Sequence, residues 1–225
     1  MTESCMRRKI KLCMTLILLI GVILLSRKLS QIVTNEDVTV KKQVIVIDPG
    51  HGGEDPGKVG VNGALEKDLN LLVAKKVKDK LEAQGMEVVM TREEDVMQGG
   101  KVEDLEKRIK LIEQTKPELV VGIHQNSFTD SNVKGAQVFY YSESEEGKAA
   151  AIIMQDELKV VDPENTREIK GNSSFFMLKK SKAPTIIVEC GFLSNQEEAE
   201  YLVTNEYQEQ LANAICSGIV KWLDK

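Results

Sequence analysis

Two histidines and two glutamates are the residues of this chain whose types and positions could do chemistry together. The chain has only two histidines, His51 and His124, and each follows a short apolar, β-branched run that is typical of a buried strand. Glu66 begins an amphipathic segment fifteen residues after His51, and Glu189 interrupts a third apolar run. We take these four side chains as the candidate site.

This combination of residue types is typical of a catalytic zinc site. Such sites commonly use two histidines and one glutamate and leave one coordination position open to water, and a further glutamate can act as a general base. A structural role stays open for Glu66, since a carboxylate in the first turn of a helix complements the helix dipole. Glu189 is harder to explain structurally, because an ionised carboxylate in so apolar a strand is costly unless it is paired or bound to a metal.

The elements that must position these residues alternate between strands and helices. Strands are predicted at residues 43–48, 86–91, 118–123, 136–141, 175–178 and 185–190. Helices are predicted at about residues 65–84, 102–112, 147–159 and 211–222, and a long polar loop at residues 162–174. This order predicts an α/β fold, a three-layer αβα sandwich with a mostly parallel, mixed sheet of about six strands. His51, His124 and Glu189 then fall at the carboxyl ends of strands, where such sheets form their sites.

The first 28 residues differ in composition from the rest of the chain. A basic cluster at residues 7–11 precedes an uncharged apolar run at residues 12–25, and two further basic residues follow at 27 and 28. The pattern predicts a secretory signal peptide or a signal anchor, with the N-terminus in the cytoplasm and the remaining chain outside. The absence of an Ala-x-Ala-like site favours an uncleaved membrane anchor, and a buried core helix is the alternative. Polar residues 29–42 are predicted to be a linker.

Charge and cysteine content exclude several other classes of protein. Residues 1–28 hold six of the 30 basic and one of the 35 acidic residues, which leaves 24 basic and 34 acidic residues, a formal charge of −10, on the remainder. This charge argues against a nucleic-acid partner. Beyond the leader only Cys190 and Cys216 remain, too few for a disulfide scaffold. Cys190 is predicted to be a buried thiol on the opposite face of its strand from Glu189.

Five motifs together resemble a known family of bacterial enzymes. They are Asp48-Pro-Gly-His-Gly-Gly53, Gly63-Ala-Leu-Glu-Lys67, Thr91-Arg92, Gly122-Ile-His-Gln-Asn-Ser127 and Val188-Glu-Cys-Gly-Phe-Leu-Ser-Asn195. In this order they resemble the zinc-dependent N-acetylmuramoyl-L-alanine amidases (amidase type 3 family). The resemblance implies a phosphorylase/hydrolase-like fold and a zinc amidase catalytic domain at residues 43–225. It also implies that His51, Glu66 and His124 bind Zn²⁺ and that Glu189 is the catalytic glutamate.

The resemblance further implies a substrate and a cellular role. The family hydrolyses the amide bond between N-acetylmuramic acid and L-alanine in peptidoglycan. A short catalytic domain without a wall-binding module looks most like the sporulation and germination members, which prepare spore-cortex peptidoglycan for muramic-δ-lactam formation and some of which act with a lipoprotein partner. Asn126, Arg92 and Arg108 are the candidate substrate contacts. The chain departs from the family at Gln125, where Ala or Asn is usual, and this departure concerns the rim of the pocket.

Two other functions stay open at this point. The first is a zinc peptidase or carboxypeptidase acting on the stem peptide, which would use the same metal and base. An arginine clamp for a terminal carboxylate would favour it, with Arg92, Arg108 and Arg167 as candidates. The second is a non-catalytic wall-binding module, although the presence of all four site residues argues against it. Both histidines are assigned to the metal, which disfavours a Ser-His or Cys-His hydrolase.

Overall fold

The computed structural model describes residues 6, 14, 16–26 and 43–225 of the chain. The chain divides into two units, Met1–Lys41 and Lys42–Lys225. In the first unit, residues 16–26 form a helix with exposed side chains, while the rest of the predicted leader, apart from residues 6 and 14, and the predicted linker at 29–42 lie outside the described residues. Among the residues that the structure describes, no helix is both long and apolar enough to cross a membrane.

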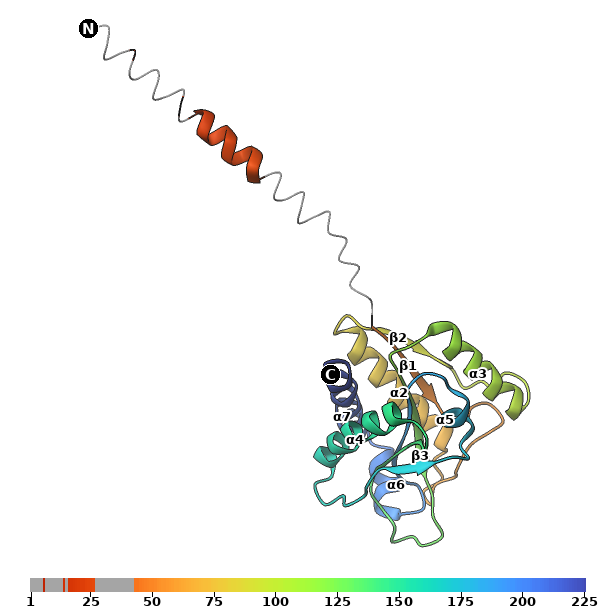
Figure 1. Cartoon of the computed structure of the whole chain (residues 1–225). Helices are drawn as coiled ribbons and strands as arrows, with labels where there is room; N and C mark the ends of the chain where they lie inside the picture. Colours follow the sequence, from red (N-terminus) through yellow and green to blue (C-terminus); the bar gives the residue numbers. More distant parts are fainter. Residues whose placement is uncertain (1–5, 7–13, 15, 27–42) are drawn as a thin grey trace. The chain divides into compact units, whose positions relative to one another are not determined.

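The second unit is built on a mixed six-stranded sheet (Figure 1). Its strands are β1 (Val44–Pro49), β2 (Glu87–Met90), β3 (Leu119–Asn126), β4 (Gln137–Tyr141), β5 (Lys170–Asn172) and β6 (Thr185–Phe192), arranged in the order β2-β1-β3-β6-β4-β5. The first four strands of this order are parallel, β4 is antiparallel to β6, and β5 is parallel to β4. The predicted mostly parallel, mixed sheet is therefore confirmed.

Helices cover both faces of this sheet, which confirms the three-layer architecture. One face packs against α2 (Glu66–Glu82), α4 (Glu145–Val161) and α7 (Asn205–Leu223), and the other against α3 (Lys101–Thr115) and α5 (Phe176–Lys180). Side chains alternate between the two layers along each strand: Ile45 and Ile47 of β1 belong to the larger core, and Val46 to the smaller. The short helix α6 (Gln196–Leu202) follows β6 directly.

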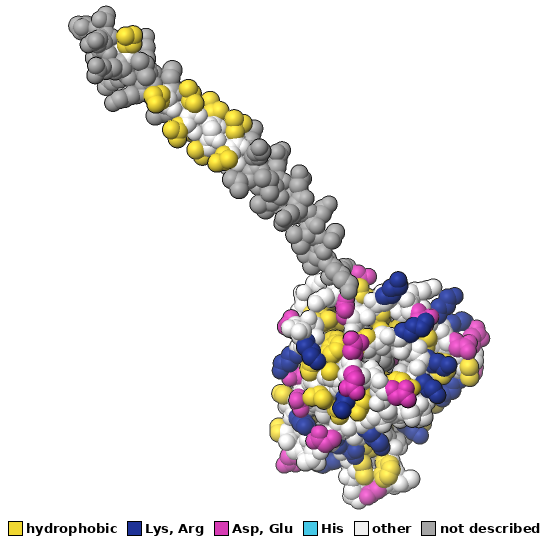
Figure 2. All heavy atoms as spheres, in the orientation of Figure 1, with side chains coloured by type: hydrophobic (Ala, Val, Ile, Leu, Met, Phe, Trp, Pro, Cys, Tyr) yellow, Lys and Arg dark blue, Asp and Glu magenta, His cyan; other side chains and the backbone are white. Residues whose placement is uncertain are grey.

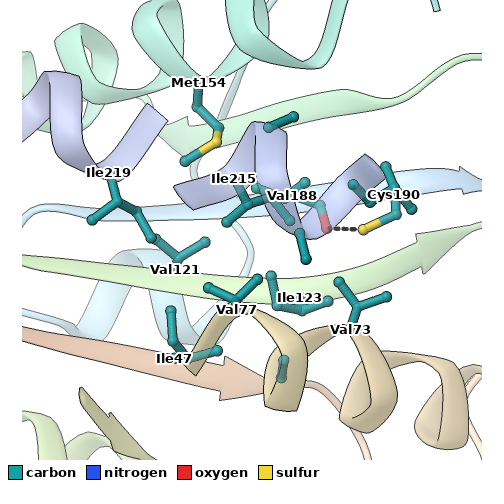
Figure 3. Packing of buried hydrophobic residues seen from close by; sticks show 14 of the residues in the cluster. Ile47, Val73, Val77, Val121, Ile123, Met154, Val188, Cys190, Ile215 and Ile219 are labelled. Atoms are coloured by element: carbon teal, nitrogen blue, oxygen red, sulfur yellow. Dashed lines mark hydrogen bonds between the residues drawn. The ribbon is translucent and has the colours of Figure 1, made fainter. Parts of the chain in front are cut away.

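The larger core lies between the sheet and α2, α4 and α7. Figure 3 shows strand side chains meeting helix side chains across this layer, among them Ile47, Val73, Val77, Val121, Ile123, Met154, Val188, Ile215 and Ile219. Cys190 belongs to the same cluster, is fully buried, and has its Sγ 4.0 Å from the Val188 carbonyl oxygen. Both Cys190 and Cys216 are free buried thiols, which confirms the buried thiol predicted at Cys190.

Side-chain caps explain why three of the helices begin where they do. Ser144, Asn195 and Thr204 precede α4, α6 and α7, and the side-chain oxygen of each accepts a hydrogen bond from a backbone N–H of the first turn. Such caps satisfy donors that the helix itself leaves without partners. The helix α3 ends at Thr115 and is capped by Lys116, which adopts a left-handed conformation before Pro117.

Two predicted elements are wrong, and both lie between β4 and β6. Residues 175–178, predicted as a strand, instead contain the N-cap Phe175 and the start of helix α5. A short apolar run fits either structure, and here Met177 and Leu178 are buried against the sheet from a helix. Within the predicted loop 162–174, Lys170–Asn172 forms the edge strand β5. This strand is largely exposed and has no apolar alternation to reveal it.

The visible face of the second unit carries no large area of a single charge. Figure 2 shows Lys and Arg side chains intermingled with Asp and Glu across it. Ion pairs occur in this unit, such as Lys78 with Glu93 at 2.6 Å and Lys76 with Glu209 at 2.8 Å. Exposed pairs of this kind contribute about 0–1 kcal/mol each, so the stability of the unit comes from its cores.

The larger core yields a test of stability on helix α2. Leu81 is fully buried in it, whereas Leu72 on the same helix is 48% exposed. We expect Leu81→Ala to lower the free energy of unfolding by about 2–5 kcal/mol, because it leaves a cavity in a packed interior. Leu72→Ala is the matched control and should change it by about 0.5 kcal/mol or less. Urea unfolding followed by circular dichroism measures both, and equal losses would contradict the packing described.

Candidate metal centre and active site

His51 stands on a sharply turned loop directly after β1. Its φ is +62°, in the left-handed region, and glycines at 52, 53 and 57 also have positive φ. A non-glycine residue seldom adopts this conformation unless its surroundings hold it there. The turn brings the His51 ring back over the carboxyl edge of the sheet, toward the ring of His124, with 5.2 Å between ring centroids.

Two buried arginines hold this loop from below. Arg108 donates to the carbonyl oxygens of Pro49 and His51, both at 2.7 Å. Arg92 donates to the carbonyl oxygens of Pro49 at 2.9 Å and Gly50 at 3.0 Å. Both arginine side chains are only 5% exposed. The backbone that delivers His51 is therefore fixed by four charge-assisted hydrogen bonds, which are stronger than neutral ones.

The charge of Arg108 is balanced inside the protein. Its Nη1 lies 2.8 Å from Asp48 and its Nε 2.7 Å from Asp104, and both carboxylates are buried. Burial alone would raise the pKa of Asp48, but Arg108 and a hydrogen bond from Thr91 outweigh it and hold this pKa below its ordinary value. The group is thus an ionised, hydrogen-bonded network, as a buried charge requires.

Glu66, the first residue of α2, lies between the two histidines. Its Oε1 is 3.2 Å from His51 Nε2 and 3.0 Å from His124 Nδ1, and its Oε2 accepts a hydrogen bond from the Lys58 backbone N–H at 2.8 Å. Burial alone would raise the pKa of Glu66, but the hydrogen bonds with His124 and His51 outweigh it and hold this pKa well below its ordinary value. Glu66 is therefore a carboxylate at neutral pH.

His124 and Glu189 lie side by side on neighbouring strands. They are register partners of β3 and β6, and the register shifts between His124 and Asn126. The ring of His124 lies against Gly50, where any side chain would overlap it. Close backbone approach of this kind requires glycine. The His124 ring is thus positioned by the strand on one side and by the loop of His51 on the other.

His51, Glu66 and His124 together form a set that could hold a metal ion. One ligand atom from each, two imidazole nitrogens and a carboxylate oxygen, lies within 4.8 Å of the others. A metal ion bound by these three atoms would replace the direct contacts between the Glu66 carboxylate and the two histidine rings. Two histidines and one glutamate suit a catalytic zinc site, so the donor set present in the structure fits such an ion.

Glu189 lies beside these three residues, and one of its carboxylate oxygens has no hydrogen-bond partner among the described residues. Its Oε2 is buried and makes no hydrogen bond with the residues that the structure describes. Burial in the apolar strand raises the pKa of Glu189 to about 7. A carboxylate with a pKa near the working pH can both accept and return a proton. Glu189 is therefore suited to general acid–base chemistry.

A pocket of about 390 Å³ opens over these residues. Besides the three metal-site residues and Glu189, it is lined by apolar side chains that include Phe175, Phe176 and Met177 at the start of α5. Lys58, Lys101 and Asp55 also line it. The arrangement combines a metal site, a base and an apolar wall, which suits hydrolysis of a polar bond in a partly apolar substrate.

Comparison with known proteins identifies the family. The profile of the N-acetylmuramoyl-L-alanine amidases matches residues 45–221, almost the whole second unit. The chain belongs to this family. Its activity is accordingly the hydrolysis of the bond between N-acetylmuramic acid and L-alanine in peptidoglycan, and this favours the amidase over the peptidase and the non-catalytic module.

Individual relatives agree with the family assignment. The amidase is 36% identical to the germination-specific N-acetylmuramoyl-L-alanine amidase of Bacillus subtilis (strain 168), over 96% of each chain. Among solved structures, it is similar to the CwlD amidase from Clostridioides difficile in complex with the GerS lipoprotein, with a TM-score of 0.79, 36% identity, and 81% of this chain and 99% of that chain covered. It is also similar to the catalytic domain of CwlV from Bacillus (Paenibacillus) polymyxa, with a TM-score of 0.74, 33% identity, and 81% and 98% covered.

The arginines of the amidase make contacts with other groups of the protein. Arg92 lies beneath the His51 loop and does not itself line the pocket. Arg108 does line the pocket, and it makes hydrogen bonds with two carbonyl groups and two carboxylates. Arg167 lies over the Phe192 ring, 4.5 Å from its centroid. These three side chains, which were the candidates for a clamp on a terminal carboxylate, thus make contacts within the protein. Asn126 does line the pocket.

Three features of the pocket escaped the sequence prediction. Asp55 contacts His51, Lys101 reaches Asp55 from α3, and the α5 residues supply the apolar wall. The signal for Asp55 was its place in a second Asp-Pro-Gly turn, four residues after His51. Lys101 and α5 gave no comparable signal, because their approach depends on how α3 and α5 pack against the sheet.

The contact between Gly50 and His124 gives a test of the metal site. A Cβ on Gly50 would lie 2.6 Å from His124 Nδ1 and still closer to Cε1 and Nε2 of the ring, so we expect Gly50→Ala to displace the ring. Zinc affinity, measured by competition with a chelator, should fall by about tenfold or more, the scale of contacts that orient metal ligands. Gly100→Ala is the control, since a Cβ there meets open space. Wild-type affinity in Gly50→Ala would contradict the ligand role of His124.

Proposed function

We propose that the amidase binds one zinc ion through His51, Glu66 and His124 and uses Glu189 as its general base. The observation that carries the proposal is the convergence of two imidazole nitrogens and a carboxylate oxygen within 4.8 Å, beside a buried carboxylate that has an oxygen without a partner. Zinc in such a site supplies Lewis acidity, which polarises the amide carbonyl and lowers the pKa of water.

Glu189 carries the proton through the reaction. It accepts a proton from the attacking water and, when the C–N bond breaks, returns it to the nitrogen of the departing L-alanine. The products are the lactyl carboxylate of N-acetylmuramic acid and a stem peptide with a free amine. A pKa near 7 suits both transfers. Glu189 must carry out both proton transfers, because His51 and His124 are assigned to the metal and are not available as acid or base. Asn126 is the proposed substrate contact at the rim of the pocket.

Spore-cortex peptidoglycan is the proposed substrate. The support is the 36% identity to an amidase named as germination-specific over 96% of both chains, together with the structural similarity to the CwlD amidase. Removal of the stem peptide exposes the lactyl carboxyl group, which is the group that a muramic-δ-lactam must contain. The reaction is therefore proposed as the first step of lactam formation during sporulation, with a product needed in germination.

The proposed location is outside the cytoplasmic membrane, at the forespore or in the cortex. Residues 1–28 have the charge and hydropathy pattern of a signal anchor or a signal peptide. Either would deliver residues 43–225, proposed as the catalytic domain, to the compartment that contains peptidoglycan. Residues 29–42 would then be the linker.

A lipoprotein is the proposed partner. The CwlD amidase, to which this chain is similar, was solved in complex with the GerS lipoprotein. In the present chain, His51 belongs to a glycine-rich loop and Glu66 follows the same loop. Arg92 and Arg108 hold the backbone carbonyl groups at residues 49–51. A partner that orders the rest of the segment, up to Glu66, would raise zinc affinity, because the entropy of ordering it is then lost at the interface and not on metal binding.

The roles of Glu189 and His124 are separable by mutation. Glu189→Gln should lower the rate of hydrolysis by about 10²–10⁴-fold or more, because an amide cannot accept the proton. It should leave zinc stoichiometry unchanged. His124→Ala should lose both zinc and activity, because a ligand is missing. Metal analysis and mass spectrometry of muropeptides measure the two effects. Near-wild-type activity in Glu189→Gln would move the base elsewhere, and undiminished zinc in His124→Ala would refute the ligand set.

Mass spectrometry of the muropeptides released from two substrates tests the proposal that the amidase acts on spore cortex. Purified spore cortex and vegetative peptidoglycan should both be supplied to the wild-type chain, with its partner where one is identified. Preferential loss of stem peptides from cortex material supports the proposal. Equal cleavage of both materials would leave an amidase without cortex preference.

The partner proposal predicts weak zinc binding by residues 43–225 alone. Titration calorimetry of this unit should show low zinc affinity, and muropeptide release should be slow until the partner is added. The control is the same titration with an unrelated lipoprotein, which should change neither quantity. Tight zinc binding and full cleavage without any added protein would contradict regulation by a partner.

A further inference from the structure

We propose that Asp55 is a positioning residue of the metal site, which orients the ring of His51 and selects its tautomer. This inference rests on the proposed function of His51 as a zinc ligand. Asp55 Oδ2 lies 2.8 Å from His51 Nδ1, and the other ring nitrogen, Nε2, lies 3.2 Å from Glu66 Oε1. The imidazole is therefore held at both nitrogens, with Asp55 on the side away from the other ligands.

The contact with Asp55 determines which nitrogen can bind a metal. An ionised carboxylate has only acceptor atoms, so Nδ1 must carry the proton and donate it to Asp55. Nε2, which donates to Glu66 in the structure, is then the nitrogen that can give up its proton and offer a lone pair to a metal. A hydrogen bond from a metal-ligating histidine to a carboxylate fixes ring orientation and increases the basicity of the ligand nitrogen. Asp55 would thus act on the metal entirely through His51.

Asp55 is itself held firmly enough to orient another side chain. Its backbone pairs with Gly52 through two hydrogen bonds of 3.0 and 3.1 Å. Its second carboxylate oxygen, Oδ1, accepts from the Gly57 backbone N–H at 3.3 Å. Lys101 Nζ approaches Oδ2 at 2.9 Å from the start of α3. The carboxylate is thus directed at His51 before any metal arrives.

His51 depends on such a contact more than His124 does. The ring of His124 extends from a strand in the sheet and packs against Gly50. His51 belongs to a loop and has a left-handed backbone conformation. The two arginines fix the carbonyl groups of this loop but do not set the rotation of the ring. Asp55 supplies that missing constraint.

The same loop provides a matched control. Asp95 accepts a hydrogen bond from the Gly53 backbone N–H at 2.7 Å and pairs with Lys67 at 2.6 Å. It supports the loop as Asp55 does, yet its hydrogen bonds go to Gly53 and Lys67 and not to a metal-site side chain. A loss caused by a weakened loop should therefore appear in Asp95→Ala, whereas a loss caused by a misdirected His51 ring should appear only at Asp55.

Zinc affinity of the full chain, measured by chelator competition, tests the proposal. Asp55→Ala should weaken zinc binding by about 10–100-fold. Asp55→Asn should weaken it less, because the amide oxygen still accepts from Nδ1–H although the charge is gone. Asp95→Ala should bind zinc as the wild type does. In ¹⁵N NMR spectra of the metal-free chain, His51 Nδ1 should carry a proton in the wild type and in Asp55→Asn, whereas in Asp55→Ala the proton should shift toward Nε2, which still faces the Glu66 carboxylate.

The outcomes separate this inference from the proposed function. A wild-type chain that binds no zinc overturns both. Zinc binding by the wild type with the same affinity in Asp55→Ala overturns the positioning role alone, and so do equal losses in Asp55→Ala and Asp95→Ala. If Asp55→Ala does not fold, Asp55→Asn decides, and wild-type affinity in that variant overturns the proposal.

Discussion

A single buried carboxylate oxygen, Oε1 of Glu66, is the point toward which the site is built. Two imidazole nitrogens face it at 3.0 and 3.2 Å, and they come from different parts of the chain. For this to happen, the start of α2, the loop after β1 and the carboxyl end of β3 must meet at one edge of the sheet. The parallel pairing of β1 with β3 brings two of them together, and the packing of α2 on the larger core brings the third.

The loop after β1 is the one of these three parts that is not a regular helix or strand, and buried charged side chains hold it in place. Arg92 and Arg108 are buried beneath it, and Asp48 and Asp104 neutralise Arg108. Buried ion pairs often contribute little net stability, because desolvating the charges offsets their attraction. Their evident effect here is geometric: they hold three consecutive carbonyl groups and so maintain a backbone conformation that His51 would not adopt in isolation.

The sequence sufficed to predict which residues lie together at the carboxyl ends of the strands. His51, His124 and Glu189 follow or interrupt apolar runs, and Glu66 begins a clear amphipathic helix, so local patterns placed all four. The roles of Arg92 and Arg108 could not be inferred in this way, because an arginine that binds substrate and one that binds backbone carbonyls look alike in a sequence. The helix α5 and the strand β5 were mistaken for a similar reason: their conformation depends on the neighbouring sheet.

The two edge strands of the sheet affect whether enzyme molecules that are crowded on one polymer aggregate. An unpaired strand edge can template pairing with another chain, and natural proteins limit this with short or charged edge strands. Here β5 has three residues, of which Lys170 and Gly171 are exposed, and β2 at the opposite edge has four. Neither edge is long enough for a stable added strand, so crowding on peptidoglycan should not drive these molecules into edge-to-edge aggregates.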